Sequence, residues 1–206
     1  MERKCISKSV RSDHEIPESK VFTTRKQNQQ VWVICPQHSS CTWFTMLLCS
    51  TMNSNAKCIP DFPHCGKPIP VVQNGVVKTT ILATGDPFAP VKHIPNRLYR
   101  IAYFKHPAEM LRSVKREGWR DNCGGMRRKF SAVDRFARRI FDGNISVDAL
   151  LFAEDVFLRG PALLHSMGFP AFRERVLSPS PRNESNFATD KLTCEWMPFL
   201  CKLYKV

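Results

Sequence analysis

The sequence predicts an α/β protein with a central parallel sheet flanked by helices. Short apolar runs rich in β-branched residues alternate along the chain with longer amphipathic segments, a pattern typical of parallel strands joined by helices. The 206 residues, 43% of them hydrophobic, are enough to bury one core. We therefore expect one α/β domain over residues 30–206. Residues 1–29 are polar and basic without apolar periodicity and are expected to form a flexible arm.

The first ordered unit is expected to be a strand, a tight polar turn and a helix. Residues 31–35 form a β-branched apolar run that suits a strand buried on both faces. Pro36 and the polar residues after it interrupt this run. The stretch 42–49 follows with Ser and Thr at its start, which favours a capped helix.

The rest of the chain continues the alternation. Residues 60–70 are rich in proline and are expected to form a loop. Further apolar runs predict strands over residues 76–82, 98–104 and 150–152. Amphipathic segments predict helices over residues 108–117, 130–141, 161–167 and 192–204. Pro198 is expected to kink the last of these helices.

Positive charge is concentrated in one part of the chain. The formal net charge is +13, and residues 97–142 hold 13 Lys and Arg against 5 Asp and Glu. Such a field attracts anions, whether nucleotide phosphates, nucleic acid, acidic glycans or a membrane surface. A solvated basic face without a partner is the other interpretation. No apolar run approaches the ~20 residues that span a bilayer, and the N-terminus lacks the apolar region of a signal peptide.

The nine cysteines form no CxxC pair and have no histidine at metal-ligand spacing, so no metal is expected. Cys35, Cys41 and Cys49 lie in or beside apolar runs and are expected to be small buried hydrophobic residues. An odd number leaves at least one thiol free. Two Asn-x-Ser acceptor sequences begin at Asn144 and Asn183, and they matter only in a secretory lumen.

Two strand–turn–helix units carry candidate phosphate ligands. In the first, helix-start N–H groups and the hydroxyls of Ser39, Ser40 and Thr42 are placed to hold a phosphate. In the second, Lys105 ends a strand and Ser113 follows eight residues later in a helix. The carboxyl ends of parallel strands meet at one edge of a sheet, where ligands bind. A cation and a hydroxyl at that edge predict a phosphate clamp.

In this order and separation, the two units resemble the sulfotransferases that use 3′-phosphoadenosine 5′-phosphosulfate. The stretch similar to the family's 5′-phosphosulfate loop is His38, Ser39, Ser40, Cys41, Thr42 and Trp43. The stretch similar to its 3′-phosphate element, a strand followed by Arg-x-Pro and a later Ser, contains Lys105, Pro107 and Ser113. Looser similarity extends over residues 30–204, including residues 151–156, which look like the family's Y-E-D-L strand end.

The resemblance implies a P-loop-like central sheet and a sulfotransferase-like domain over residues 30–206. It implies that 3′-phosphoadenosine 5′-phosphosulfate is the co-substrate, without a metal. The sulfuryl group would pass to a hydroxyl or amine acceptor, either a small molecule or a glycan, including an anionic one. The sequence contains no motif that identifies the acceptor. Neither the cytoplasm nor the Golgi lumen is singled out.

The chain departs from the family at the residues nearest the chemistry. His38 replaces the loop lysine, Ser40 replaces a glycine, and Lys105 replaces the arginine. Thr80 stands where the cytosolic branch has its catalytic histidine. A member with reduced activity that keeps the nucleotide site is therefore a close variant of the hypothesis.

The remaining catalytic candidates are side chains that can carry a positive charge or accept a proton. His38 can donate to a phosphate oxygen, and Lys78 is placed as a cation near the donor sulfonate. His93, and after it His64, are the candidate bases.

Two other classes stay open. One is a P-loop nucleotide kinase, although the G-x-x-x-x-G-K-[ST] signature is missing. The other is a non-enzymatic binder of polyanions or nucleic acid that uses the basic residues 97–142. Nucleic acid is not the expected partner, because no known recognition module is present.

Overall fold

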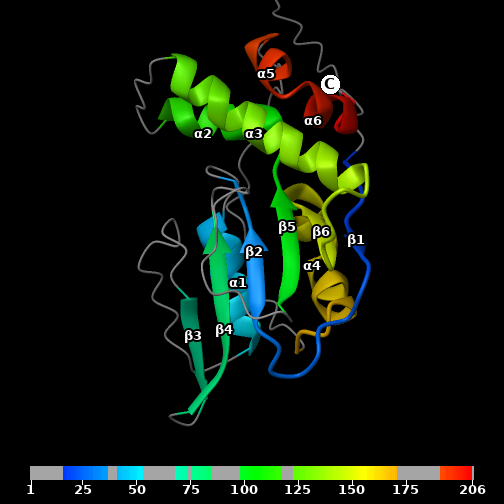
Figure 1. The fold of residues 1–206 in the computed structure, drawn as a ribbon. Helices are drawn as coiled ribbons and strands as arrows, with labels where there is room; N and C mark the ends of the chain where they lie inside the picture. The colour runs from blue at the N-terminus through cyan, green and yellow to red at the C-terminus, as the bar shows by residue number, and fades with distance from the viewer. Residues whose placement is uncertain are drawn as a thin grey trace, which may run out of the picture.

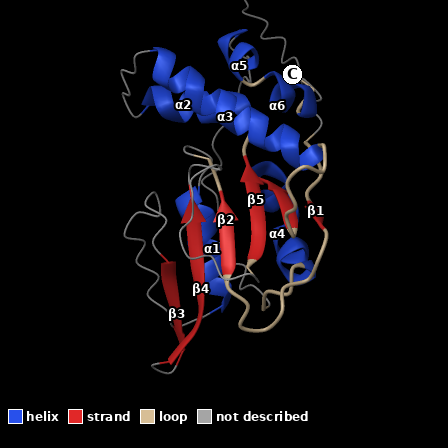
Figure 2. Ribbon diagram, viewed as in Figure 1, coloured by secondary structure: helices blue, strands red, loops and turns tan. Residues whose placement is uncertain are grey.

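The computed structural model describes residues 16–36, 41–52, 68–73, 76–84, 98–116, 123–170 and 191–205. In these residues a six-stranded sheet has the order β1-β6-β5-β2-β4-β3, with helices around it (Figures 1 and 2). The strands are β1 (Lys20–Val21), β2 (Val31–Ile34), β3 (Pro68–Gln73), β4 (Val76–Thr84), β5 (Tyr99–Phe104) and β6 (Ala149–Phe152). The helices are α1 (Cys41–Met52), α2 (Pro107–Arg116), α3 (Cys123–Phe141), α4 (Ala153–Ser166), α5 (Lys191–Trp196) and α6 (Pro198–Leu203).

The sheet is mixed and mostly parallel. Strands β6, β5, β2 and β4 run parallel to one another, whereas β1 and β3 pair antiparallel at the two edges. The predicted α/β class with flanking helices is confirmed. The central strands are parallel, as predicted, but the sheet as a whole is mixed because both edge strands run antiparallel. At one edge only two residues separate β3 from β4, and so short a connection can join antiparallel strands only.

The proline-rich segment 60–70 was expected to be a loop, yet residues 68–70 begin β3. Proline has no N–H to donate to a ladder, so it is tolerated in a strand only where that donor is not needed, as at an edge. Strand β3 is at the edge of the sheet. The prolines therefore mark an edge strand at this point.

Two apolar layers cover the two faces of the sheet. Val33 of β2 is the register partner of Ile101 in β5, and both pack in a cluster with α1 and α4. The next pair along, Ile34 and Ala102, packs in a second cluster with α2, α3, α5 and α6. Successive residues in a strand point to opposite faces, which explains this division. Figure 1 shows α2, α3, α5 and α6 gathered at the end toward which the parallel strands point.

Three of the predicted helices differ most from those in the structure. Helix α3 begins at Cys123, earlier than the predicted start at residue 130. Helix α4 starts directly after β6, and its second half matches the predicted helix 161–167 to within one residue, with non-helical dihedral angles at Arg159 before Pro161. The predicted helix 192–204 is two helices, α5 and α6, and Pro198 is the first residue of the second. Proline fits the first turn of a helix because its missing N–H has no partner there.

Residues 16–29, here called the N-terminal strap, are held against the domain, whereas a flexible arm was expected. The N–H of Ser19 donates to Asp155 (2.7 Å), and the Ser19 hydroxyl accepts from the N–H of Phe152 (3.0 Å). The Tyr99 hydroxyl donates to the carbonyl of Thr23 (2.7 Å). These bonds are made by polar groups, and hydrophobic periodicity does not detect them. Residues 1–15 lie outside the described residues.

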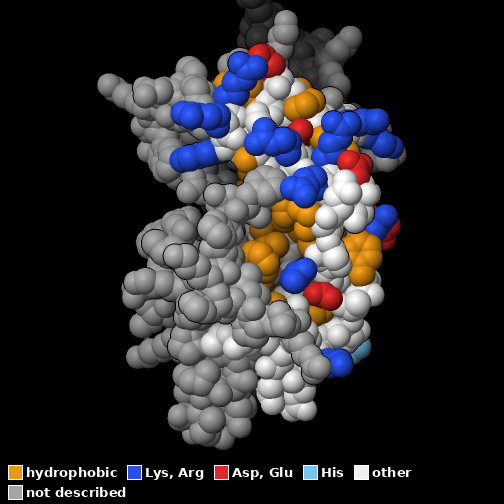
Figure 3. All heavy atoms as spheres, viewed as in Figure 1, with side chains coloured by type: hydrophobic (Ala, Val, Ile, Leu, Met, Phe, Trp, Pro, Cys, Tyr) orange, Lys and Arg blue, Asp and Glu red, His pale blue; other side chains and the backbone are white. Residues whose placement is uncertain are grey.

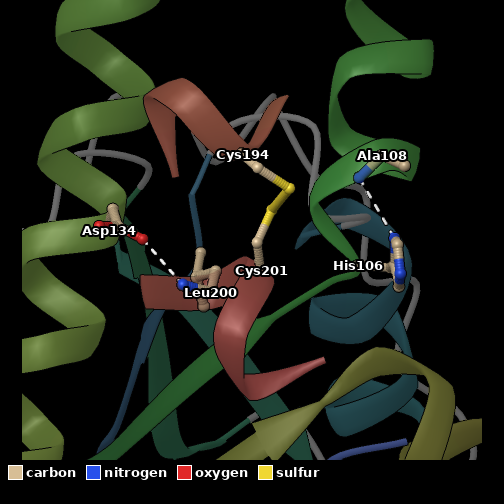
Figure 4. The surroundings of a disulfide bond; sticks show 6 residues. All are labelled: His106, Ala108, Asp134, Cys194, Leu200 and Cys201. Atoms are coloured by element: carbon tan, nitrogen blue, oxygen red, sulfur yellow. Dashed lines mark hydrogen bonds between the residues drawn. A yellow bond between two sulfur atoms is a disulfide. The ribbon is translucent and has the colours of Figure 1, made fainter. Parts of the chain in front are cut away.

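Disulfide bonds join several of the described cysteines. Cys35, after β2, is bonded to Cys41, the first residue of α1, and Cys194 of α5 is bonded to Cys201 of α6 (Figure 4). Cys49 is also disulfide-bonded. The prediction that Cys35, Cys41 and Cys49 are buried is confirmed, but the prediction that they serve as plain hydrophobic residues is wrong. A buried cysteine can be either a free thiol or part of a disulfide, and only the distance between sulfur atoms distinguishes these two states.

Across the described helices, none combines the length and the apolar character that a membrane crossing requires.

Candidate functional site

The topology singles out one place at the carboxyl edge of the sheet. Strands β2 and β5 are parallel neighbours, and the chain leaves them in opposite directions. After β2 it goes to β3 and β4 on one side, and after β5 it goes to β6 on the other. In open α/β sheets, ligands bind at such a switch in strand order. The start of α1 and the start of α2 both lie at this edge.

Lys105 lies directly after β5 at this edge. Its side chain is largely buried, and its Nζ is 3.7 Å from Glu109 Oε2, one turn into α2. Glu109 also pairs with Arg112. Ser113 lies one further turn along α2 and is half-buried. Residues four apart share a helix face, so Glu109 and Ser113 lie on one face of α2, and Lys105 lies just before the start of that helix.

The carboxylate of Glu109 places a negative charge beside Lys105. It lies between the cation and the hydroxyl in sequence, and it is an anion already paired with Lys105. An anion that approached Lys105 would have to compete with this carboxylate.

A second polar cluster adjoins Lys105 at the start of α4. Glu154 Oε1 accepts the backbone N–H of His106 (3.0 Å), and Glu154 Oε2 accepts the hydroxyl of Tyr204 (2.9 Å). The rings of His106 and Tyr204 meet edge to face, with centroids 4.8 Å apart. The backbone N–H of Ala108 donates to His106 Nδ1 (3.2 Å) (Figure 4). Glu154 thus connects the end of β5, the start of α2 and the end of α6.

Burial governs the proton affinities in this cluster. Burial raises the pKa of Glu154, although the hydrogen bonds from His106 and Tyr204 and the nearby Lys105 oppose it. Burial, and after it the charge of Glu154, raises the pKa of Tyr103 and of Tyr204 well above the ordinary value. Both tyrosines are therefore neutral at physiological pH and can only donate or accept hydrogen bonds.

The structure describes only some of the residues that resemble the phosphosulfate loop. His38, Ser39 and Ser40 lie outside the described residues. Cys41 begins α1 and its sulfur is bonded to Cys35, so it offers no thiol to a ligand. Thr42 lies in the first turn of α1.

The last residue of that loop, Trp43, is half-buried against the apolar core. Its ring lies 4.6 Å from that of Phe157 in α4. It packs against the cluster beneath α1 and α4. The contact of Trp43 in this structure is therefore with the apolar core.

The structure describes only some of the remaining catalytic candidates. Lys78 lies in β4, next but one along that strand to Thr80, which is half-buried. Strand β4 is the neighbour of β2. His93 and His64 lie outside the described residues. Of the site residues proposed from sequence, the structure places Lys105 after β5, just before α2, and Ser113 within α2.

Sequence reasoning missed Glu109, Glu154 and Tyr204. The four-residue spacing from Lys105 to Glu109 was a usable signal, because it predicts an ion pair on a helix. Glu154 and Tyr204 are 50 positions apart in the chain, and no local pattern relates them. Among the described residues, no group of three or more His, Cys, Asp or Glu side chains could hold a metal ion.

Basic side chains cover the outer face of α3. The exposed ones are Arg127, Arg128, Lys129, Arg135, Arg138 and Arg139. Figure 3 shows Lys and Arg gathered over the helical end of the molecule in this view. The two helices that follow the carboxyl edge, α2 and α3, thus carry much of the positive charge of the chain.

The fold is that of an α/β protein with a mostly parallel mixed sheet and flanking helices. Comparisons with protein families, with curated proteins and with solved structures found no match to this chain.

Proposed function

We propose that this chain binds 3′-phosphoadenosine 5′-phosphosulfate between the carboxyl ends of β2 and β5 and is a sulfotransferase with a P-loop-like sheet. The observation that carries the proposal is Lys105 at the switch in strand order, just before α2, the helix that contains Ser113. Nucleotides bind at such switches in parallel sheets. The motif resemblance over residues 38–43 and 105–113 supplies the identity of the nucleotide.

In this proposal the two phosphate ends of the donor lie on two helix starts. Lys105, just before α2, and Ser113 within α2 hold the 3′-phosphate. The loop after β2 and the first turn of α1 hold the 5′-phosphosulfate, where unpaired N–H groups and the helix dipole favour an anion. His38, Ser39, Ser40 and Thr42 belong to this half of the proposed site.

The proposed reaction moves one sulfuryl group. The acceptor oxygen or nitrogen forms a bond to sulfur while the bond from sulfur to the 5′-phosphate oxygen breaks. The acceptor proton passes to a base, and 3′,5′-ADP leaves. Charge grows on the leaving phosphate, which cations stabilise. Lys78 and His38 are the proposed cations, and His93 is the proposed base.

Binding of 3′,5′-ADP, measured by isothermal titration calorimetry, tests the proposal. Lys105→Ala is expected to weaken binding by about tenfold or more, because a charge-assisted hydrogen bond contributes about 1.5–3 kcal/mol. Ser113→Ala should weaken it by less. Glu109→Gln should strengthen it, because it removes the anion that competes for Lys105. Lys202→Ala removes the same charge from an exposed position on α6 and serves as the control.

The absence of binding at millimolar nucleotide would contradict the proposal. Equal binding by the wild type, Lys105→Ala and Glu109→Gln would show that the nucleotide binds elsewhere. Turnover is a separate question, which a labelled-donor assay with hydroxyl and amine acceptors answers.

The exposed basic row of α3 supports a second candidate, a binder of polyanions without catalysis. It predicts binding to arbitrary DNA or sulfated glycan that falls steeply with added salt. Replacing Arg127, Arg128 and Lys129 together with alanine should weaken that binding strongly and leave 3′,5′-ADP binding nearly unchanged.

A further inference from the structure

The turn after α3 presents an acceptor sequence for N-linked glycosylation. The sequence Asn144-Ile145-Ser146 follows Gly143. Asn144 and Ser146 are both exposed, and Ile145 between them is half-buried. Asn144 and Ser146, the two side chains that the transfer reaction recognises, therefore face solvent. Ile145, which the reaction does not recognise, packs against the apolar core.

The turn is held by its backbone and not by the asparagine side chain. The N–H groups of Asn144 and Ile145 both donate to the carbonyl of Arg139, at 2.8 and 3.1 Å. Gly143 has φ +74°, the left-handed conformation that commonly ends a helix. Within the described residues, the side-chain amide of Asn144 makes no hydrogen bond. A glycan on this amide would displace no packed group.

The disulfides supply an independent observation about the compartment. Cys35 and Cys41 are bonded at the start of α1, and Cys194 and Cys201 are bonded between α5 and α6. Structural disulfides persist in oxidising compartments and are rare in the cytosol. In eukaryotic cells the oxidising compartment in which chains fold is also the one in which asparagine is glycosylated.

We propose that Asn144 carries an N-linked glycan and that the chain acquires its disulfides in the same secretory lumen. In the step proposed, the Asn144 amide nitrogen loses a proton and forms a bond to the anomeric carbon of a lipid-linked oligosaccharide. The bond from that carbon to the lipid pyrophosphate breaks. Each disulfide forms as two thiols lose two electrons and two protons to a lumenal thiol oxidant. The proposal does not depend on the sulfotransferase activity.

Peptide mapping of the protein isolated from its own cells is the direct test. Peptide N-glycosidase F is expected to release a glycan and leave aspartate at position 144, which mass spectrometry detects. A peptide with unmodified asparagine at position 144 as the main form would overturn the proposal.

Translation of the chain behind a cleavable signal sequence, with microsomes, tests the acceptor itself. Asn144→Gln and Ser146→Ala are each expected to remove one glycosidase-sensitive gel shift, and Ser146→Thr should retain it. Asn183→Gln is the matched control for the second acceptor sequence. A shift that Asn144→Gln leaves intact would contradict the assignment. Asn144→Gln should not change the melting temperature, which distinguishes lost modification from misfolding.

Maleimide labelling before and after reduction tests the compartment. In protein taken from its own cells under acid quench, Cys35, Cys41, Cys194 and Cys201 are expected to be labelled only after reduction. Labelling of these four cysteines without reduction would show that the chain resides in a reducing compartment.

Discussion

Glu154 is the residue on which the interior polar cluster depends. Its two carboxylate oxygens accept from the N–H of His106 and from the hydroxyl of Tyr204. His106 is the neighbour of Lys105, so the position of the proposed phosphate-binding cation depends on a carboxylate from another element. Because burial raises the pKa of Glu154, ionising this carboxyl group in the folded protein costs free energy.

The pH dependence of stability should reveal this cost. The folded-state pKa of Glu154 is raised, so the protonated form is favoured in the folded protein. Its contribution to stability is present in full below the ordinary carboxyl pKa and is lost as the pH rises through the raised value. Glu154→Gln cannot ionise and should lose less stability over that interval. Urea unfolding from pH 4 to 8 measures the difference.

Glu195→Gln is the control for this measurement, because it removes an exposed carboxyl from α5. Parallel curves of unfolding free energy against pH for the wild type and Glu154→Gln would refute the prediction.

Helix α6 is short and depends on a neighbouring helix for its start. Pro198 is its first residue, and the N–H of Leu200 donates to Asp134 Oδ1 of α3 at 2.9 Å (Figure 4). Asp134 is buried. A carboxylate at a helix start satisfies N–H groups that have no partner within the helix. The Cys194–Cys201 disulfide ties the same helix to α5.

Asp134→Ala is expected to lower the free energy of unfolding by about 1–2 kcal/mol, because it removes a buried cap. Asp142→Ala, at the exposed carboxyl end of α3, should have little effect or be slightly stabilising. Chemical denaturation of both variants makes the comparison. Equal stability of Asp134→Ala and the wild type would show that water replaces the cap.

The elements that the sequence predicts well are those with a strong local pattern. The apolar runs at residues 31–35 and 98–104 lie within one residue of β2 and β5, because strands buried on both faces are continuous in apolar character. The two-residue β1 has no such pattern, since it depends on its pairing with β6. Likewise Lys105 is visible as a strand-end cation, whereas Glu154 becomes part of the site only through long-range packing.

At the scale of the whole molecule, the N-terminal strap connects distant parts of the domain. It adds β1 to β6, and Glu18 pairs with Arg159, which also pairs with Asp155. Burial alone would raise the pKa of Asp155, but hydrogen bonds from Arg159 and Ser19 outweigh it and lower the pKa. The strap therefore contributes to the stability of the start of α4.

Two truncations test this contribution. A chain that begins at residue 16 retains the strap and serves as the reference. A chain that begins at residue 30 loses the hydrogen bonds of Ser19, Thr23 and β1, each contributing about 1 kcal/mol, and should melt several degrees lower. Equal melting temperatures of the two truncations would show that the strap contributes nothing to stability.

The antiparallel strands at the two edges also bear on how copies of this protein meet. An exposed strand edge is a template for pairing between molecules. Strand β1 offers only two residues to such a template. Strand β3 contains Pro68 and Pro70, which bring no N–H donor to an added strand. The sheet thus ends in two strands that are poor seeds for fibrils, and the protein should resist edge-to-edge aggregation when it is concentrated.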